Sequence, residues 1–174
     1  MTLNMQGASL AEALPQGPVA IFDILATRIR ENVGYLLMTV LVPAGDAPFL
    51  NRVFSTNQDQ YPLGTADPIE DSIWFRRLFT EGEPIVANDA QAIEAWLPGF
   101  DAYRAQGYGS LANIPIVISG TTIGLVNLMD EAGHFTAQRL SDLRQELPVA
   151  ALAVLASGVG TGEPEARGSG NTAP

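Results

Sequence analysis

The sequence contains no cysteine and no lysine, and its one histidine is His134. The absence of cysteine excludes disulfides, thiolate metal sites and cysteine nucleophiles. A single histidine excludes any metal site that needs two histidine ligands. Nine basic residues, all arginine, stand against nineteen acidic residues, so the net charge is −10. Because nucleic acid and anionic lipid bind basic surfaces, this charge argues against either as a partner.

Segments that direct a protein to a membrane are also missing. Residues 1–17 contain no basic segment followed by a long apolar run, so they do not resemble a signal peptide. The uncharged run from Ser110 to Met129 is interrupted by Pro115 and by the turn-forming residues 119–122. This pattern predicts two buried strands joined by a tight turn rather than a membrane span. We therefore expect a cytoplasmic protein with no membrane partner.

Length and composition favour one folded domain. The chain has 174 residues, of which 47% are hydrophobic and 16% charged, a balance typical of a globular domain of ordinary size. Residues 157–174 are rich in glycine and proline, so we expect them to form a disordered tail. We place the folded domain at residues 18–156 and interpret residues 1–17 as an N-terminal extension.

The apolar periodicity predicts an α+β domain. Helices are expected at residues 18–32, 72–81, 90–97, 100–107 and 136–156, and strands at residues 35–42, 49–55, 84–87, 110–118 and 122–129. Residues 56–68 are expected to be irregular. Pro148 should kink the last helix or divide it, because proline lacks an amide donor and clashes with the preceding turn. The long helices near both ends should pack on one face of an antiparallel sheet.

Apolar residues cover much more than one side of the first predicted helix. Phe22, Ala26 and Ile29 form one stripe at helical spacing, and Ile21 and Leu25 widen it. A helix that is apolar over much of its circumference needs cover on two sides. We expect a second copy of the protein to supply one of these covers.

Three segments then form a pattern in a fixed order. Residues 74–86 (WFRRLFTEGEPIV) resemble a helix that ends in a Gly-x-Pro turn and re-enters a sheet. Residues 107–116 (GYGSLANIPI) resemble a Gly-x-x-Ser segment leading into an Asn-x-Pro strand, and residues 120–136 hold a turn glycine, a strand glycine and the start of the last helix. Together they resemble the GAF domain family of small-molecule sensors. The PAS domain is the nearest alternative, but residues 120–135 suit GAF better.

The resemblance implies an antiparallel sheet of five or six strands, with terminal helices on one face and short helices and loops covering a ligand cavity on the other. It also implies a homodimer formed through the terminal helices. The GAF domains that attach bilins or reduce methionine sulfoxide use cysteine, which is absent. The cyclic-nucleotide motif is broken by Leu128, Arg139 and Leu140, and His134, expected on the surface, is a poor haem ligand. We expect no cofactor and no metal.

Candidate ligand-binding residues lie in the segments expected to form or cover the cavity: Tyr61, Trp74, Asp89, Trp96, Tyr108, Ser110, Asn113 and Asn127. The two tryptophans either stack on a planar ligand or fill the core. Asp89 either caps a helix or contacts the ligand. The polar residues on apolar strands need a partner, which is backbone, water or ligand. Arg52, inside an apolar strand pattern, either meets a carboxylate ligand or points to solvent.

These expectations favour a sensor domain that binds a small apolar or planar molecule and acts without a fused output domain. The alternative is an enzyme in which Asp89 and either Tyr61 or Tyr108 exchange protons with a small metabolite. A scaffold that uses only the dimer surface is the third hypothesis.

Overall fold

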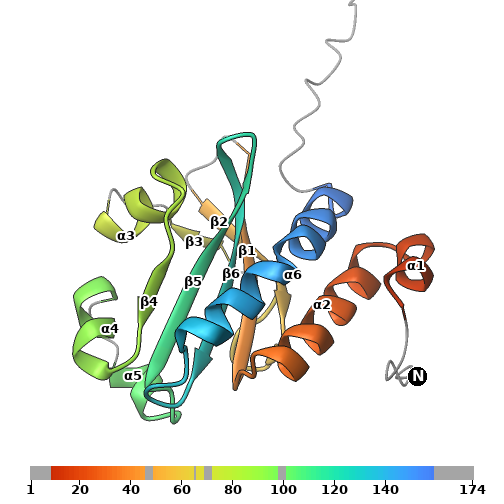
Figure 1. Ribbon diagram of the computed structural model, residues 1–174. Coiled ribbons are helices and arrows are strands. Elements are labelled where there is room, and N and C mark those ends of the chain that lie inside the picture. The colour runs from red at the N-terminus through yellow and green to blue at the C-terminus, as the bar shows by residue number, and fades with distance from the viewer. Residues whose placement is uncertain (1–8, 46–48, 65, 69–71, 98–100, 159–174) are drawn as a thin grey trace, which may run out of the picture.

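The computed structural model describes residues 9–45, 49–64, 66–68, 72–97 and 101–158 (Figure 1). The helical elements are α1 (Leu10–Ala13), η1 (Leu14–Gln16), α2 (Pro18–Asn32), α3 (Ile73–Phe75), η2 (Arg76–Thr80), α4 (Ala90–Trp96), α5 (Asp101–Arg104) and α6 (Ala137–Ala156). The strands are β1 (Leu37–Pro43), β2 (Phe49–Ser55), β3 (Ala66–Pro68), β4 (Ile85–Ala87), β5 (Ser110–Ile118) and β6 (Thr121–Asp130). Most of the predicted tail lies outside the described residues.

The described strands form one six-stranded sheet in the order β3-β2-β1-β6-β5-β4. Every pair of neighbours in it is antiparallel. The two longest strands, β5 and β6, form a hairpin at the Ser119–Gly120 turn, where both residues have positive φ. The predicted α+β class and antiparallel sheet are confirmed. The segment expected to be irregular contributes the short strand β3.

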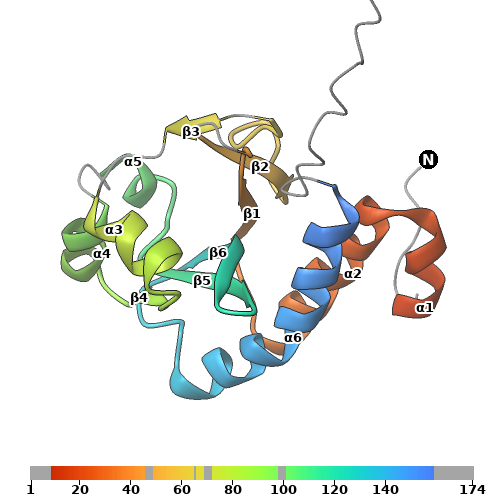
Figure 2. The ribbon, with the colours of Figure 1, turned by 90° about the horizontal axis from the view of Figure 1, so that it is seen from above.

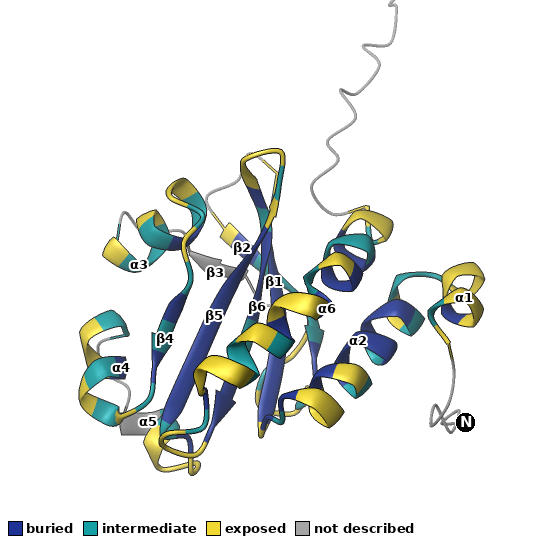
Figure 3. Ribbon diagram, in the orientation of Figure 1, coloured by how far each residue is buried: buried dark blue, intermediate teal, exposed yellow. Residues whose placement is uncertain are grey.

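The sheet separates two layers of different character (Figure 2). The long helices α2 and α6 lie on one face, and α3, η2, α4 and α5 lie toward the other. Side chains alternate along a strand, so Met38, Val40, Ala112, Ile114 and Val126 join the helices in the main core. Their sequence neighbours face the second layer. The central strands are accordingly buried on both faces (Figure 3).

Helix α2 finds both of its covers within the same chain. Ile21, Ile24, Leu25 and Ile29 are buried among residues of the sheet and of α6. Part of the expected N-terminal extension is also folded, because α1 and η1 pack beside α2 and Ala13 is fully buried. The broad apolar surface of α2 therefore does not by itself require a second copy of the protein.

Helix α6 is continuous through Pro148, so of the two outcomes expected at this proline, a kink or a division, the division does not occur. Thr136 caps the helix by accepting a hydrogen bond from the Arg139 amide. Pro148 is exposed, and at this position the helix lacks the amide hydrogen bond that proline cannot donate. Among the described residues no helix combines the length and the apolarity needed to cross a bilayer.

Candidate ligand cavity

A cavity of about 260 Å³ lies over the sheet face that α2 and α6 leave open. Its floor comes from four strands, which contribute Leu37, Thr39, Leu41, Leu50, Arg52, Leu111, Asn113, Asn127 and Met129. Its cover comes from the connecting segments, which contribute Tyr61, Trp74, Leu97 and Tyr103. Among the described residues that line the cavity there is no carboxylate, histidine or serine.

The strand register arranges the floor in rows that cross the sheet. Leu37, Met129 and Leu111 stand opposite one another on β1, β6 and β5. The next row of the same face holds Thr39, Asn127 and Asn113. Beyond it, Leu41 and Leu125 return to apolar side chains. The floor is therefore a polar row between two apolar rows.

The polar row forms a continuous hydrogen-bonded chain. The Trp74 indole N–H donates to Asn113 Oδ1 at 2.9 Å, and Asn113 Nδ2 donates to Asn127 Oδ1 at 2.7 Å. Asn127 Nδ2 then donates to Thr39 Oγ1 at 3.4 Å. Buried polar groups need such partners, and Asn113 and Thr39 are only 3% and 6% exposed. These hydrogen bonds tie Trp74, in the cover, to the floor.

Tyrosines form one wall of the cavity. The rings of Tyr61 and Tyr103 stack with centroids 6.4 Å apart, and the Tyr61 hydroxyl donates to Gln106 Oε1 at 3.2 Å. Burial, with smaller contributions from Tyr108 and Tyr103, raises the pKa of Tyr61 to about 12. Burial also raises the pKa of Tyr108. Tyr61 is consequently a neutral phenol at physiological pH and cannot act there as a ready-made base.

Arg52 brings a positive charge to the cavity beside Tyr61. Its guanidinium lies 5.7 Å from the centroid of the Tyr61 ring and donates from Nη1 to the Pro62 carbonyl oxygen at 3.1 Å. Arg52 is half-buried and lines the cavity. The sequence left its direction open, and the structure places it toward the cavity.

Four of the eight sequence candidates line the cavity, namely Tyr61, Trp74, Asn113 and Asn127. The other four lie elsewhere. Asp89 is exposed and caps α4 by accepting from the Ala92 amide. Ser110 is fully buried and donates to the Glu131 carbonyl oxygen at 2.7 Å.

The remaining two candidates pack beside the cavity. Trp96 packs against an apolar cluster of the sheet and η2 that includes Leu50 and Leu78. Tyr108 packs in a second cluster with Leu111 and Met129. Neither residue is among the described residues that line the cavity.

Thr39, Leu97 and Tyr103 were not predicted as site residues. Thr39 lies in a continuous apolar run that hides the alternation of β1. Its membership becomes visible only through its pairing with Asn127. Leu97 follows α4 and Tyr103 lies in α5, two short helices whose position over the sheet no local pattern specifies.

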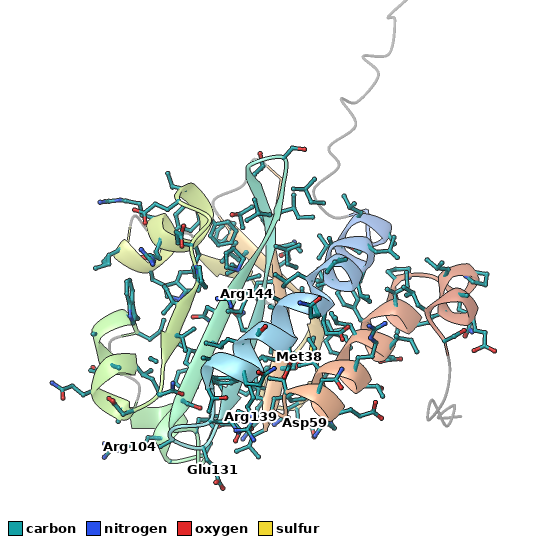
Figure 4. All side chains as sticks on the ribbon, in the orientation of Figure 1. Met38, Asp59, Arg104, Glu131, Arg139 and Arg144 are labelled. Carbon is teal, nitrogen blue, oxygen red and sulfur yellow. The ribbon has the colours of Figure 1, made fainter. Side chains whose placement is uncertain are left out.

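His134 is not the surface histidine that was expected, since its side chain is only 14% exposed. Its Nε2 lies 3.0 Å from the Val33 carbonyl oxygen, at the end of α2, and its Nδ1 lies 3.3 Å from Asp130 Oδ1. The loop that carries it leads to Arg139, at the same end of the molecule as Glu131 (Figure 4). His134 thus links the end of α2 to the end of β6, and it does not line the cavity. Within the described part of the chain, no three acidic or histidine side chains group as metal ligands.

Comparison with known proteins agrees with this architecture. The GAF domain of a two-component sensor histidine kinase from Bacillus halodurans has a TM-score of 0.62 at 16% identity, over 79% of this chain and 93% of that chain. The GAF domain from an Acinetobacter phosphoenolpyruvate-protein phosphotransferase has a TM-score of 0.63 at 14% identity, over 93% of this chain and 100% of that chain. These likenesses concern the fold.

A third similar structure, the GAF domain/HD domain protein from Geobacter sulfurreducens, has a TM-score of 0.65 at 13% identity, over 80% of this chain and 93% of that chain. No curated protein matches the sequence. The sequence pattern of the GAF domain family matches residues 16–155, which is most of the chain. The protein belongs to the GAF domain family.

Proposed function

We propose that the cavity over β1, β5 and β6 binds a small molecule and that the protein acts as a sensor of it. The observation that carries this proposal is the polar row of Thr39, Asn127 and Asn113 at the centre of an otherwise apolar floor. Small-molecule sites are mostly apolar, with a few polar groups that orient the ligand.

Native mass spectrometry of gently purified protein tests the proposal. We expect a bound small mass, released on denaturation, that identifies the ligand class. In a matched pair of variants, Leu97→Trp fills the cavity from its cover, whereas Leu36→Trp adds the same volume at an exposed position just before β1. Loss of the mass in Leu97→Trp alone supports the cavity. Equal retention in both variants contradicts it.

The alternative of an enzyme required a carboxylate in the cavity, and Asp89 does not supply it. Asp89, which was to exchange protons with Tyr61 or Tyr108, caps α4 and does not line the cavity. Tyr61, with a pKa of about 12, holds its proton at neutral pH. We therefore propose binding rather than a reaction.

We also propose that the protein forms a homodimer through its terminal helices. Leu14, Val19 and Leu155 are 46%, 70% and 50% exposed on η1, α2 and α6. Exposed apolar side chains on neighbouring helices favour an interface. Light scattering after size exclusion should give twice the 18.5 kDa mass of the chain, and Val19→Glu should halve it. A wild-type monomer at high concentration would refute the dimer.

A further inference from the structure

The hydrogen-bonded chain on the cavity floor has a fixed direction. An indole N–H can only donate, so the Asn113 atom that faces Trp74 must be the oxygen. The Asn113 amide nitrogen must then face Asn127, whose oxygen accepts from it, and the Asn127 nitrogen faces Thr39. Amide orientation is ordinarily ambiguous in a structure. Here one tryptophan settles it for both asparagines.

The direction of the chain decides which hydrogens are left unused. Each asparagine nitrogen carries two hydrogens and spends one on its neighbour. Thr39 Oγ1 accepts from Asn127, which leaves the hydroxyl hydrogen of Thr39 to donate elsewhere. The floor therefore offers two amide N–H groups and one hydroxyl as donors. The oxygens of Asn113 and Asn127 already accept a bond each within the chain.

We infer that the ligand is a small planar molecule with an acceptor-only edge, such as a carboxylate or a ketone on a ring. The inference rests on the proposed binding function. The acceptor edge lies along the row of Thr39, Asn127 and Asn113, and the ring covers the apolar row of Leu37, Met129 and Leu111. A ligand edge that only donates would leave the three remaining donors of the row unpaired, and it would have to share oxygens that already accept a hydrogen bond.

Charge and size agree with this class of ligand. Arg52 brings a positive charge to the cavity, and the described lining residues include no carboxylate. An engineered apolar cavity of about 150 Å³ holds benzene. The cavity of about 260 Å³ therefore has room for a ring with a substituent of a few atoms.

The test uses four ring probes of similar size that differ in their polar edge: toluene, acetophenone, benzoate and benzamidinium. Affinities are measured by calorimetry on the full chain. We expect acetophenone and benzoate to bind and benzamidinium to bind about tenfold more weakly or worse, because the last probe only donates. Toluene reports whether the cavity admits a ring at all.

Two variants examine the row itself. In Asn127→Asp the new carboxylate accepts from both Asn113 and Thr39, so the row stays satisfied while its donors are reduced. We expect Asn127→Asp to lose benzoate and to gain benzamidinium. Trp74→Phe removes the donor that fixes the direction, and it should narrow the difference between acetophenone and benzamidinium while toluene binding persists.

The outcomes separate this inference from the proposed function. Binding of toluene without a preference for acetophenone and benzoate over benzamidinium overturns the ligand class and leaves a binding cavity. An unchanged preference in Asn127→Asp also overturns it. If none of the four probes binds, the ligand class is refuted. In that case a bound mass in the native spectrum still supports a sensor, and its absence removes that function too.

Discussion

The pKa and the hydrogen bonding of the Tyr61 side chain depend on its burial in the layer over the cavity. It lies in the connection after β2, stacks on Tyr103 and faces the cavity across from the asparagine row. Its raised pKa follows mainly from burial. The neutral hydroxyl can then donate to Gln106 over the whole physiological range. At this scale the cavity wall is a hydrogen-bonded aromatic surface rather than a titrating one.

Alkaline titration should show this burial directly. A phenol whose folded pKa is raised stabilises the fold fully below its ordinary pKa of about 10. That contribution is lost as the pH rises toward about 12, because the unfolded chain gives up the proton first. Ultraviolet absorbance of tyrosinate should include a component near pH 12. Tyr61→Phe should reduce this component, whereas Tyr35 and Tyr108, whose pKa values burial also raises, should still titrate above the ordinary range.

An asparagine just after β4 helps to hold the loop between β6 and α6 to the sheet. Asn88 Nδ2 donates to the Phe135 carbonyl oxygen, and Asn88 Oδ1 accepts from the Phe135 amide, both at 3.0 Å. The Phe135 side chain is buried in the main core. Asn88 thus connects the β4 edge of the sheet to the start of α6.

Replacing Asn88 should measure the strength of this connection. Asn88→Ala leaves both backbone groups of Phe135 without a partner, and we expect a loss of about 1–3 kcal/mol in the free energy of unfolding. Asn88→Asp keeps the acceptor for the Phe135 amide, so its loss should be smaller. Urea denaturation of the three proteins gives the comparison. Equal stability of Asn88→Ala and the wild type would contradict the role.

The sequence predicts these elements better than it predicts their alignment. Asn113 and Asn127 are assigned correctly to neighbouring strands of a hairpin by their apolar surroundings and the Gly120 turn. Counting back from the turn, where Ile118 pairs with Thr121, would place Asn113 opposite Val126. The observed pairing of the two asparagines depends on an irregularity near Ile116 that shifts the register by one residue.

A one-residue shift moves a side chain to the other face of a sheet. The local sequence gives no sign of the shift near Ile116. The same applies to Arg52, which reaches the cavity because the register of β1 and β2 also shifts, between Val40 and Leu41. The sequence therefore predicts the fold, and four of its eight candidate residues line the cavity. Their assembly into a row depends on pairings between distant segments.

At the scale of the whole molecule, an ion pair joins α2, which lies early in the chain, to α6, the last helix. Arg28 Nε lies 2.7 Å from Glu146 Oε2 in an ion-pair contact, and Asn32 Nδ2 donates to Glu146 Oε1 at 3.4 Å. The Glu146 side chain is only 3% exposed, whereas Arg28 is 44% exposed. A buried carboxylate depends strongly on such partners.

Removal of Arg28 should therefore weaken the packing of the two long helices. We expect Arg28→Ala to lower the free energy of unfolding by about 1–3 kcal/mol, less than for a fully buried pair because Arg28 is partly solvated. Adding Glu146→Leu to this variant should restore most of the loss, since no buried charge remains. Arg144→Ala, at an exposed position on α6 (Figure 4), is the control. A loss that persists in the double variant would contradict the ion-pair account.

The alternation along the central strands gives neighbouring residues two different roles, one in the cavity and one in the core. On β5, Asn113 faces the cavity, while Ala112 and Ile114 on either side of it pack under the long helices. A mutation at one codon can thus alter the lining of the cavity, and mutations at the adjacent codons alter how firmly the protein folds. The shape and polarity of the cavity can therefore change by single substitutions that leave the hydrophobic core under the long helices intact.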